Sequence, residues 1–266
     1  MGFFSKAGLD VEIQTMPPGP AIAAAITSNT INIGYSDVYV LATLHSKNSS
    51  FVIIAPAAEY SSSTSAHVAA LVVPANSPVQ HAGDLNGKLI AEPALHSLAE
   101  SAARGWIDQN GGDSSTVKFA AIPFPAMPAA LDAGRIDAAW FVEPFVTTST
   151  KNGRVLAYGF DGIAKRFLVS AWFTTQQWAK DHPDLVVRFS AAMHDTAVWA
   201  NQNPMRSGEI LAKHTDLDPT VIATMTRTRF GEQLTPTLIQ PFIDVFAKYN
   251  GFSTFPAREL IYVPSR

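Results

Sequence analysis

The 266-residue chain contains no cysteine. This absence excludes disulfide bonds, thiol nucleophiles and metal sites built on cysteine. No apolar stretch approaches the roughly 20 residues that a membrane-spanning helix needs. There is no run of basic residues, and the formal net charge is only -3. Because phosphate binding needs concentrated Lys and Arg, we predict that nucleic acid is not a partner.

The signatures of common enzymes are missing as well. The chain has no nucleophile elbow, no glycine-rich dinucleotide or phosphate loop, and no zinc-protease helix motif. Its 7 histidines include no i, i+4 pair that would suit a metal. His194 and Asp195 are neighbours within a predicted helix, so their side chains point apart and form no dyad. We therefore predict no catalytic residue, no metal and no cofactor.

The chain does contain enough apolar sequence for a large core, with 47% hydrophobic and 15% charged residues. Residues 24–40 and 130–145 follow the same order of helix end, turn, short apolar strand and polar loop. Strands alternate with helices from residue 11 to 55 and again from 89 to 145, which predicts an α/β fold with mostly parallel sheets flanked by helices. The first predicted strand, residues 11–16, ends at a Pro-Pro-Gly-Pro break.

The repeat predicts two similar lobes, the second inserted in the first. Apolar segments at residues 68–73 and 167–173 would connect them. We expect residues 1–70 and 168–266 to form lobe 1, with a helical C-terminal tail, and residues 71–167 to form lobe 2. Two connections allow a hinge to close without unfolding either lobe. A single continuous α/β sheet is the alternative.

Polar residues follow several predicted strands, just ahead of helices. In open α/β sheets, ligands lie beyond the carboxyl ends of the strands. The N–H groups at the helix starts after Ser36 and Ser97 would favour an anionic or strongly accepting ligand group, and aromatic rings would stack on a flat ligand. The predicted ligand-binding residues are Tyr35, Ser36, Asp37, Tyr60, Ser61, Ser62, His96, Ser97, Glu143 and Trp172.

Some of these residues also fit a purely structural role. Ser36, Asp37 and Ser97 would serve equally as helix caps. Glu143 stands between a buried strand and Pro144. Its carboxylate would accept hydrogen bonds from a ligand, pair with an arginine, or cap nearby backbone N–H groups. Residues 59–65 are expected to form a polar loop beside the cleft.

Four stretches of the sequence resemble one known family. Residues 2–12, GFFSKAGLDVE, are similar to the motif near the start of ABC-importer solute-binding proteins of the nitrate, sulfonate, taurine and thiamine-precursor branch. Residues 71–88 resemble its L-V-V, S-P and D-L-x-G-K motifs. Residues 125–145 resemble its most recognisable segment, and residues 256–261 its usual tail. The resemblance covers essentially the whole chain.

The resemblance implies a two-lobed type II periplasmic-binding fold. It implies that the protein captures a small organic solute, such as a sulfonate, a carboxylate or a pyrimidine-like molecule, between the lobes and delivers it to an ABC permease. It further implies a periplasmic or extracytoplasmic location, although the chain shows no signal peptide. Relatives have a strand and a helix ahead of the G-F-F segment. We therefore expect a missing N-terminal strand, and a monomer unless a partner chain supplies that strand.

A second departure from the family and two rival functions accompany the resemblance. Where many relatives carry Gly-Ser-Thr, this chain has His96, Ser97 and Leu98, so a preference for small anions is not carried over. One rival is an enzyme similar to the thiamine pyrimidine synthase of the same fold, which uses a histidine, pyridoxal phosphate, iron and a Cys-rich segment. This chain lacks Cys and has no lysine in the predicted cleft loops. The other rival is an effector-sensing domain of a regulator, for which no DNA-binding segment is present.

Overall fold

The protein is described by a computed structural model over residues 1–16, 20–63 and 67–264. The predicted break at residues 17–19, and Thr64 and Ser65 of the predicted polar loop, lie outside these ranges. No helix within the described ranges is both long and apolar enough to cross a membrane.

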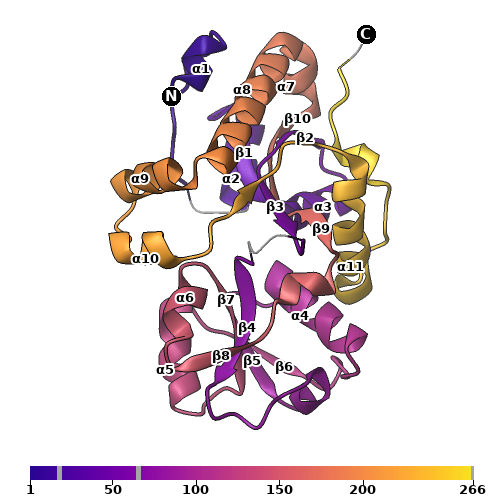
Figure 1. The fold of residues 1–266 in the computed structure, drawn as a ribbon. Coiled ribbons are helices and arrows are strands. Elements are labelled where there is room, and N and C mark those ends of the chain that lie inside the picture. Colours follow the sequence, from indigo (N-terminus) through magenta and orange to yellow (C-terminus); the bar gives the residue numbers. More distant parts are fainter. Residues whose placement is uncertain (17–19, 64–66, 265–266) are drawn as a thin grey trace.

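The chain folds into two lobes, as predicted, and Figure 1 shows them one above the other. Lobe 2 is formed by β4 (Ala69–Pro74), η1 (Ala82–Leu85), β5 (Leu89–Glu92), α4 (Leu98–Gln109), β6 (Lys118–Ala121), η2 (Phe124–Ala126), α5 (Met127–Asp132), β7 (Ala138–Val142), α6 (Phe145–Ser149), β8 (Gly153–Ala157) and η3 (Gly159–Gly162).

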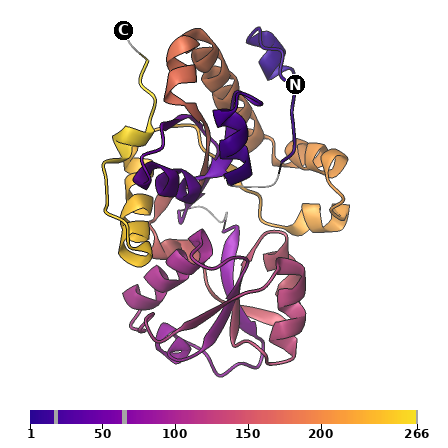
Figure 2. The same cartoon turned by 180° about the vertical axis from the view of Figure 1, so that it is seen from behind.

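Lobe 1 consists of the elements on either side of that insertion, and both chain ends lie on it (Figure 2). They are α1 (Phe3–Lys6), α2 (Pro20–Thr27), β1 (Gly34–Asp37), α3 (Val38–Ser46), β2 (Phe51–Pro56), β3 (Ala58–Ser61), β9 (Arg166–Leu168), β10 (Ser170–Thr175), α7 (Gln176–Asp181), α8 (Pro183–Gln202), α9 (Pro204–His214), α10 (Pro219–Thr224), β11 (Arg229–Phe230), η4 (Pro236–Leu238), α11 (Gln240–Asn250) and η5 (Ala257–Leu260).

The sheet of lobe 2 has five strands in the order β6-β5-β7-β4-β8. Strand β5 runs parallel to β6 and β7, whereas β4 runs antiparallel to β7 and β8. Trp140 and Phe141 of β7 are both buried, because α4 covers one face of this sheet while α5 and α6 cover the other (Figure 1). The apolar strand predicted there is therefore a central one.

The prediction of a mostly parallel sheet is wrong for lobe 1. Strand β10 lies between β1 and β2 and is antiparallel to both. The physical reason is that β10 enters lobe 1 from lobe 2, so it runs opposite to its neighbours. Strands β11, β3 and β9 form a second small antiparallel sheet at the junction of the lobes.

Residues 11–16 do not form the predicted strand. They have no regular secondary structure, and Ile13 is 82% exposed. Alternating side chains are not sufficient for a strand, because the backbone N–H and C=O groups also need a neighbouring strand. Within the described ranges, β1 is paired on one side only, by β10.

The two crossovers between the lobes lie side by side. Part of the predicted polar loop forms β3, which pairs with β9. The carboxylate of the buried Glu59 accepts hydrogen bonds from Nε and Nη2 of Arg166, at 3.1 and 3.0 Å. The predicted lobe boundaries, after residues 70 and 167, fall inside β4 and β9. The exact division of the chain stays a prediction.

Helix α4 packs against η3 through a close glycine contact. A Cβ atom on Gly105 would lie 2.4 Å from the carbonyl oxygen of Gly162. Only glycine allows this approach, which fixes α4 beside the second crossover.

Helix α11 of lobe 1 also contacts α4 of lobe 2. The Tyr249 hydroxyl donates to Asp108 at 2.7 Å, and Asn250 Nδ2 donates to Ser101 Oγ at 2.8 Å. Burial raises the pKa of Asp108, but hydrogen bonds from Tyr249, Ser114 and Lys248 outweigh it and lower this pKa to about 2. These bonds tie the lobes together along α4, at Ser101 in its first half and at Asp108 near its end.

Candidate functional site

A cavity of about 420 Å³ lies where the two lobes meet. Lobe 2 contributes the segment after β7, and lobe 1 contributes β1, the β2–β3 junction, β10, α8, α9 and the loop after α10. The lining residues are Tyr35, Pro56, Ala57, Ala58, Glu143, Pro144, Trp172, Met193, Thr196, Ala197, Ala200, Leu211, Leu217, Met225, Thr226, Arg227, Thr228 and Phe230.

One wall of the cavity is the apolar face of α8. Met193, Ala197 and Ala200 follow the i, i+4, i+7 spacing that places side chains on one side of a helix. Leu211 of α9 adds to this wall. The sequence pattern predicted this helix and its apolar stripe, although not that part of the stripe borders a cavity.

Tyr35 and Trp172 form the aromatic part of the lining. They stand opposite each other in the β1–β10 register, and their rings meet edge to face with centroids 5.4 Å apart. The indole Nε1 of Trp172 is shielded from solvent and has no hydrogen-bond partner among the described residues. A buried donor without a partner is unusual in folded proteins.

Glu143 reaches the cavity from lobe 2. Its carboxylate accepts hydrogen bonds from the Thr147 N–H and hydroxyl group, each at 3.0 Å, which holds the first turn of α6. It also accepts one from the Thr226 N–H of lobe 1 at 3.0 Å. Of the roles open from sequence, capping of backbone N–H groups is the one present here.

Arg227 is a cavity residue that the sequence analysis missed. Within the described ranges its guanidinium makes one hydrogen bond, a long one of 3.4 Å to Ser207 Oγ, and no ion pair with a carboxylate. Burial lowers the pKa of its guanidinium. No local pattern marks this residue, since it follows a short helix in an ordinary Thr-Arg-Thr sequence.

The start of α3 and the residues before α4 face each other across the lobe junction. Asp37 caps α3, accepting from Val40 N–H at 2.8 Å, as predicted for a capping role. Burial raises the pKa of Asp37 even though two backbone N–H groups oppose the shift. The Tyr39 hydroxyl donates to the carbonyl of His96. Ser36, which precedes the cap, is buried within β1.

The start of α4 is rich in carboxyl groups. Ser97 caps the helix, as predicted, and its hydroxyl donates to Glu92 Oε2 at 2.7 Å. Burial raises the pKa of Glu92 to about 8, and its second oxygen has no hydrogen-bond partner among the described residues. Glu100 accepts from His96 N–H and pairs with Arg104 at 2.7 Å. Burial raises the pKa of Glu100, but these two contacts lower it overall.

The remaining three predicted residues lie at the crossovers. Tyr60 is fully buried, and its hydroxyl donates to Asp161 at 3.0 Å. Burial and this bond raise the pKa of Tyr60. Ser61 is also buried, and the Ser62 N–H donates to the Lys165 carbonyl at 2.8 Å. These contacts join the two connections between the lobes.

The structure therefore brings three of the ten predicted residues together around the cavity, namely Tyr35, Glu143 and Trp172. The other seven surround the lobe junction without lining that cavity. Contact with a ligand stays a prediction for all ten.

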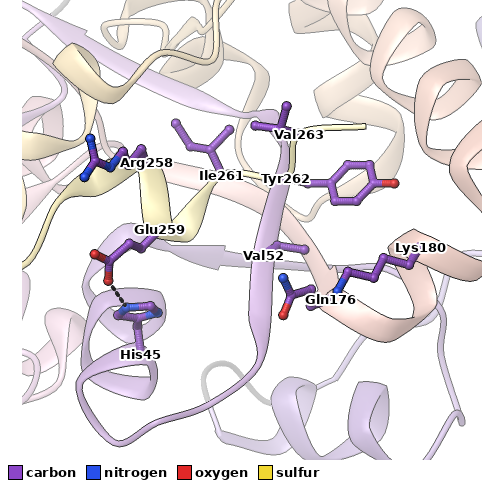
Figure 3. A pocket seen from close by; sticks show the side chains of 9 residues that line it. All are labelled: His45, Val52, Gln176, Lys180, Arg258, Glu259, Ile261, Tyr262 and Val263. Atoms are coloured by element: carbon purple, nitrogen blue, oxygen red, sulfur yellow. Dashed lines mark hydrogen bonds and ion pairs between the residues drawn. The ribbon is translucent and has the colours of Figure 1, made fainter. Parts of the chain in front are cut away.

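A second cavity, of about 470 Å³, lies within lobe 1 (Figure 3). It is bordered by α3, β2, α7 and the segment after η5. In Figure 3, His45 and Glu259 are joined by an ion pair of 3.2 Å, and Lys180 extends from α7 on the opposite side. None of the ten predicted residues borders it. Because only one lobe surrounds it, closure of the lobes would not enclose a ligand there.

No group of three or more His, Asp or Glu side chains suited to a metal occurs within the described ranges.

Comparison with known proteins gives a family for most of the chain. Residues 1–207 match the family model described as NMT1/THI5 like. The taurine-binding periplasmic protein of Escherichia coli (strain K12) is 26% identical over 206 residues, which are 76% of this chain and 61% of that relative. This chain thus spans less than two thirds of the relative's length. Arg227 lies beyond the part that matches the family model.

Solved structures show the same fold at low sequence identity. The periplasmic aliphatic sulphonate binding protein SsuA of Escherichia coli superposes with a TM-score of 0.75 and 19% identity, covering 94% of this chain and 82% of its own. A Candida albicans protein described as having the generic periplasmic binding protein fold superposes with a TM-score of 0.69 and 12% identity, covering 98% and 89%. The predicted α/β periplasmic-binding fold is therefore confirmed, with mixed sheets in place of mostly parallel ones.

Proposed function

The chain belongs to the NMT1/THI5-like family, and on this premise we propose that it is the solute-binding protein of an ABC importer. It captures a small organic molecule, such as a sulfonate, a carboxylate or a pyrimidine-like compound, between its lobes and delivers it to a permease. The names of its relatives support binding over catalysis, since they describe taurine- and sulphonate-binding proteins.

The observation that carries this proposal is the cavity at the lobe junction. Its volume of about 420 Å³ falls in the usual range for small-molecule sites, about 300–1,000 Å³. Its walls are largely apolar, with a few polar groups that would fix the orientation of a ligand. Because both lobes contribute to the lining, a ligand bound there favours the closed arrangement of the lobes.

We further propose that Tyr35, Trp172 and Glu143 lie against the bound solute. The other predicted residues at the junction, from Ser36 to Ser97, lie around the entrance or at the hinge. The crossovers at β3–β4 and η3–β9 act as that hinge, since they are the two connections between the lobes. A single copy works in a periplasmic or extracytoplasmic compartment, in keeping with the location named for its relatives.

A thermal-shift screen of alkanesulfonates, carboxylates and pyrimidines tests the proposal. A ligand present at 100 times its Kd stabilises the folded state by about 2.7 kcal/mol. For a protein of this size, that raises the melting temperature by about 5 °C or more. Small-angle scattering with the best hit should then show a more compact particle.

Steady conversion of the hit into a product would refute a binding role and favour the enzyme rival. The absence of any shift across the whole screen would also count against the proposal. A bound pyridoxal phosphate absorbance band would point to the same rival.

A further inference from the structure

At the start of α4, where a ligand was predicted, several donors already bond within the chain. Ser97 Oγ accepts from the N–H groups of Ala99 at 3.0 Å and Glu100 at 3.3 Å. The Ser97 hydroxyl proton is directed to the fully buried Glu92. The Glu100 carboxylate is ionised through its pair with Arg104. An anion at this helix start would therefore meet carboxyl groups and no free hydroxyl donor.

The cavity at the lobe junction has the opposite character. Arg227 lines this cavity and has five N–H donors, which make one long bond, to Ser207, among the described residues. Glu143, the other charged residue of the lining, already accepts three hydrogen bonds from the protein.

The position of Arg227 is fixed by two neighbours. The N–H of Thr226, the residue before Arg227, donates to the Glu143 carboxylate, and this bond ties the loop after α10 to lobe 2. In α9, Gly208 leaves space for the guanidinium, because a Cβ atom there would lie 2.9 Å from Arg227 Nη1. A glycine inside a helix lowers helix stability, so a packing role for it is expected.

We propose that Arg227 binds the anionic group of the solute, a sulfonate or a carboxylate. This inference rests on the proposed solute-binding function and adds the position of the charge-recognising site. The guanidinium donates to the anion, and the apolar body of the solute lies against α8 and α9. The start of α4 does not bind the charge.

Isothermal titration calorimetry at pH 7 tests this with two matched probes, hexane-1-sulfonate and its neutral counterpart hexane-1-sulfonamide. The hexanoate and hexanamide pair tests the carboxylate form. The wild-type protein should bind at least one anion at least tenfold more tightly than its neutral partner. In Arg227→Gln, this preference should fall below threefold.

Arg206→Gln is the matched control. Arg206 lies on the same helix as Gly208, but it is exposed and stacks over Trp199 at 5.5 Å, outside the cavity. This variant should keep the wild-type preference. Melting temperatures of all variants show whether each one is folded.

The outcomes separate the two proposals. If the wild type binds anions and folded Arg227→Gln keeps the full preference, the assignment of Arg227 is wrong while the binding function stands. If only uncharged or cationic solutes shift the melting temperature in the broad screen, the anion site is again overturned. If no solute of any charge binds, the proposed function itself fails.

Discussion

Replacing Gly208 by alanine separates the position of Arg227 from the stability of the fold. Gly208 lies in the middle of α9, where alanine is favoured over glycine by about 0.5–1 kcal/mol. The added Cβ would meet Arg227 Nη1 at 2.9 Å and Ile222 Cγ2 at 3.4 Å. The second distance is an ordinary contact, and the first involves the end of a flexible side chain.

We therefore expect Gly208→Ala to be stable but weaker in binding. Its free energy of unfolding should change by between about 0 and +1 kcal/mol, which corresponds to a rise in melting temperature of at most about 4 °C. The guanidinium has to move away from α9. The Gly208→Ala variant should therefore bind hexane-1-sulfonate at least threefold more weakly than the wild type in calorimetry.

Gly105→Ala provides the contrast, because its Cβ would meet backbone at 2.4 Å and not a mobile side chain. That substitution should lower the free energy of unfolding by about 1–3 kcal/mol, as overpacking does. The reasoning is refuted if Gly208→Ala is destabilised as strongly as Gly105→Ala. It is equally refuted if Gly208→Ala binds the anion as the wild type does while Arg227→Gln does not.

Three further predictions concern carboxyl groups. Glu143→Gln should lower the free energy of unfolding by about 1–3 kcal/mol in urea titration, because the NH₂ group of the new glutamine would face donors such as the Thr226 N–H. Unchanged stability would contradict the three hydrogen bonds that the carboxylate accepts. Burial raises the folded-state pKa of Glu92 to about 8. Between about pH 5 and 8, the free energy of unfolding of the wild type should therefore fall by about 1.4 kcal/mol per pH unit relative to that of Glu92→Gln. Parallel curves of stability against pH for the two proteins would exclude this. The pKa of Asp108 is lowered to about 2, so Asp108→Asn should be less stable than the wild type at pH 7 by about 1–2 kcal/mol. This difference should shrink as the pH falls from about 4 towards 2, and a pH-independent difference would point to another cause. Tyr249→Phe, which removes one hydrogen bond to Asp108, should show part of the same loss.

Local features of the structure follow from the sequence. The apolar spacing in residues 183–201 predicted α8, and the caps Asp37 and Ser97 were placed correctly. Each depends only on side chains within a turn or two of the helix, so the pattern is visible in a short window. The repeat of strand and helix also predicted two lobes.

Pairing between distant segments does not follow from such windows. Residues 11–16 alternate as a strand does, yet they remain unpaired, while the polar residues of β3 pair with β9. The direction of β10 depends on where the chain re-enters lobe 1, which no local pattern records. The same holds for the cavity, since Arg227 becomes part of it only through the packing of α9 and the bond from Thr226 to Glu143.

Ser97 shows why a correct local prediction led to a different site chemistry. Its capping role predicted a helix start with donors available to a ligand anion. In the folded chain, the same hydroxyl donates to Glu92, which is 0% exposed and five residues earlier at the end of β5. The sequence around Glu92 gives no sign of this burial, because it arises from the packing of β5 between β6 and β7. An anion at this helix start would meet carboxyl groups, whereas the Arg227 guanidinium in the cavity makes a single long hydrogen bond among the described residues.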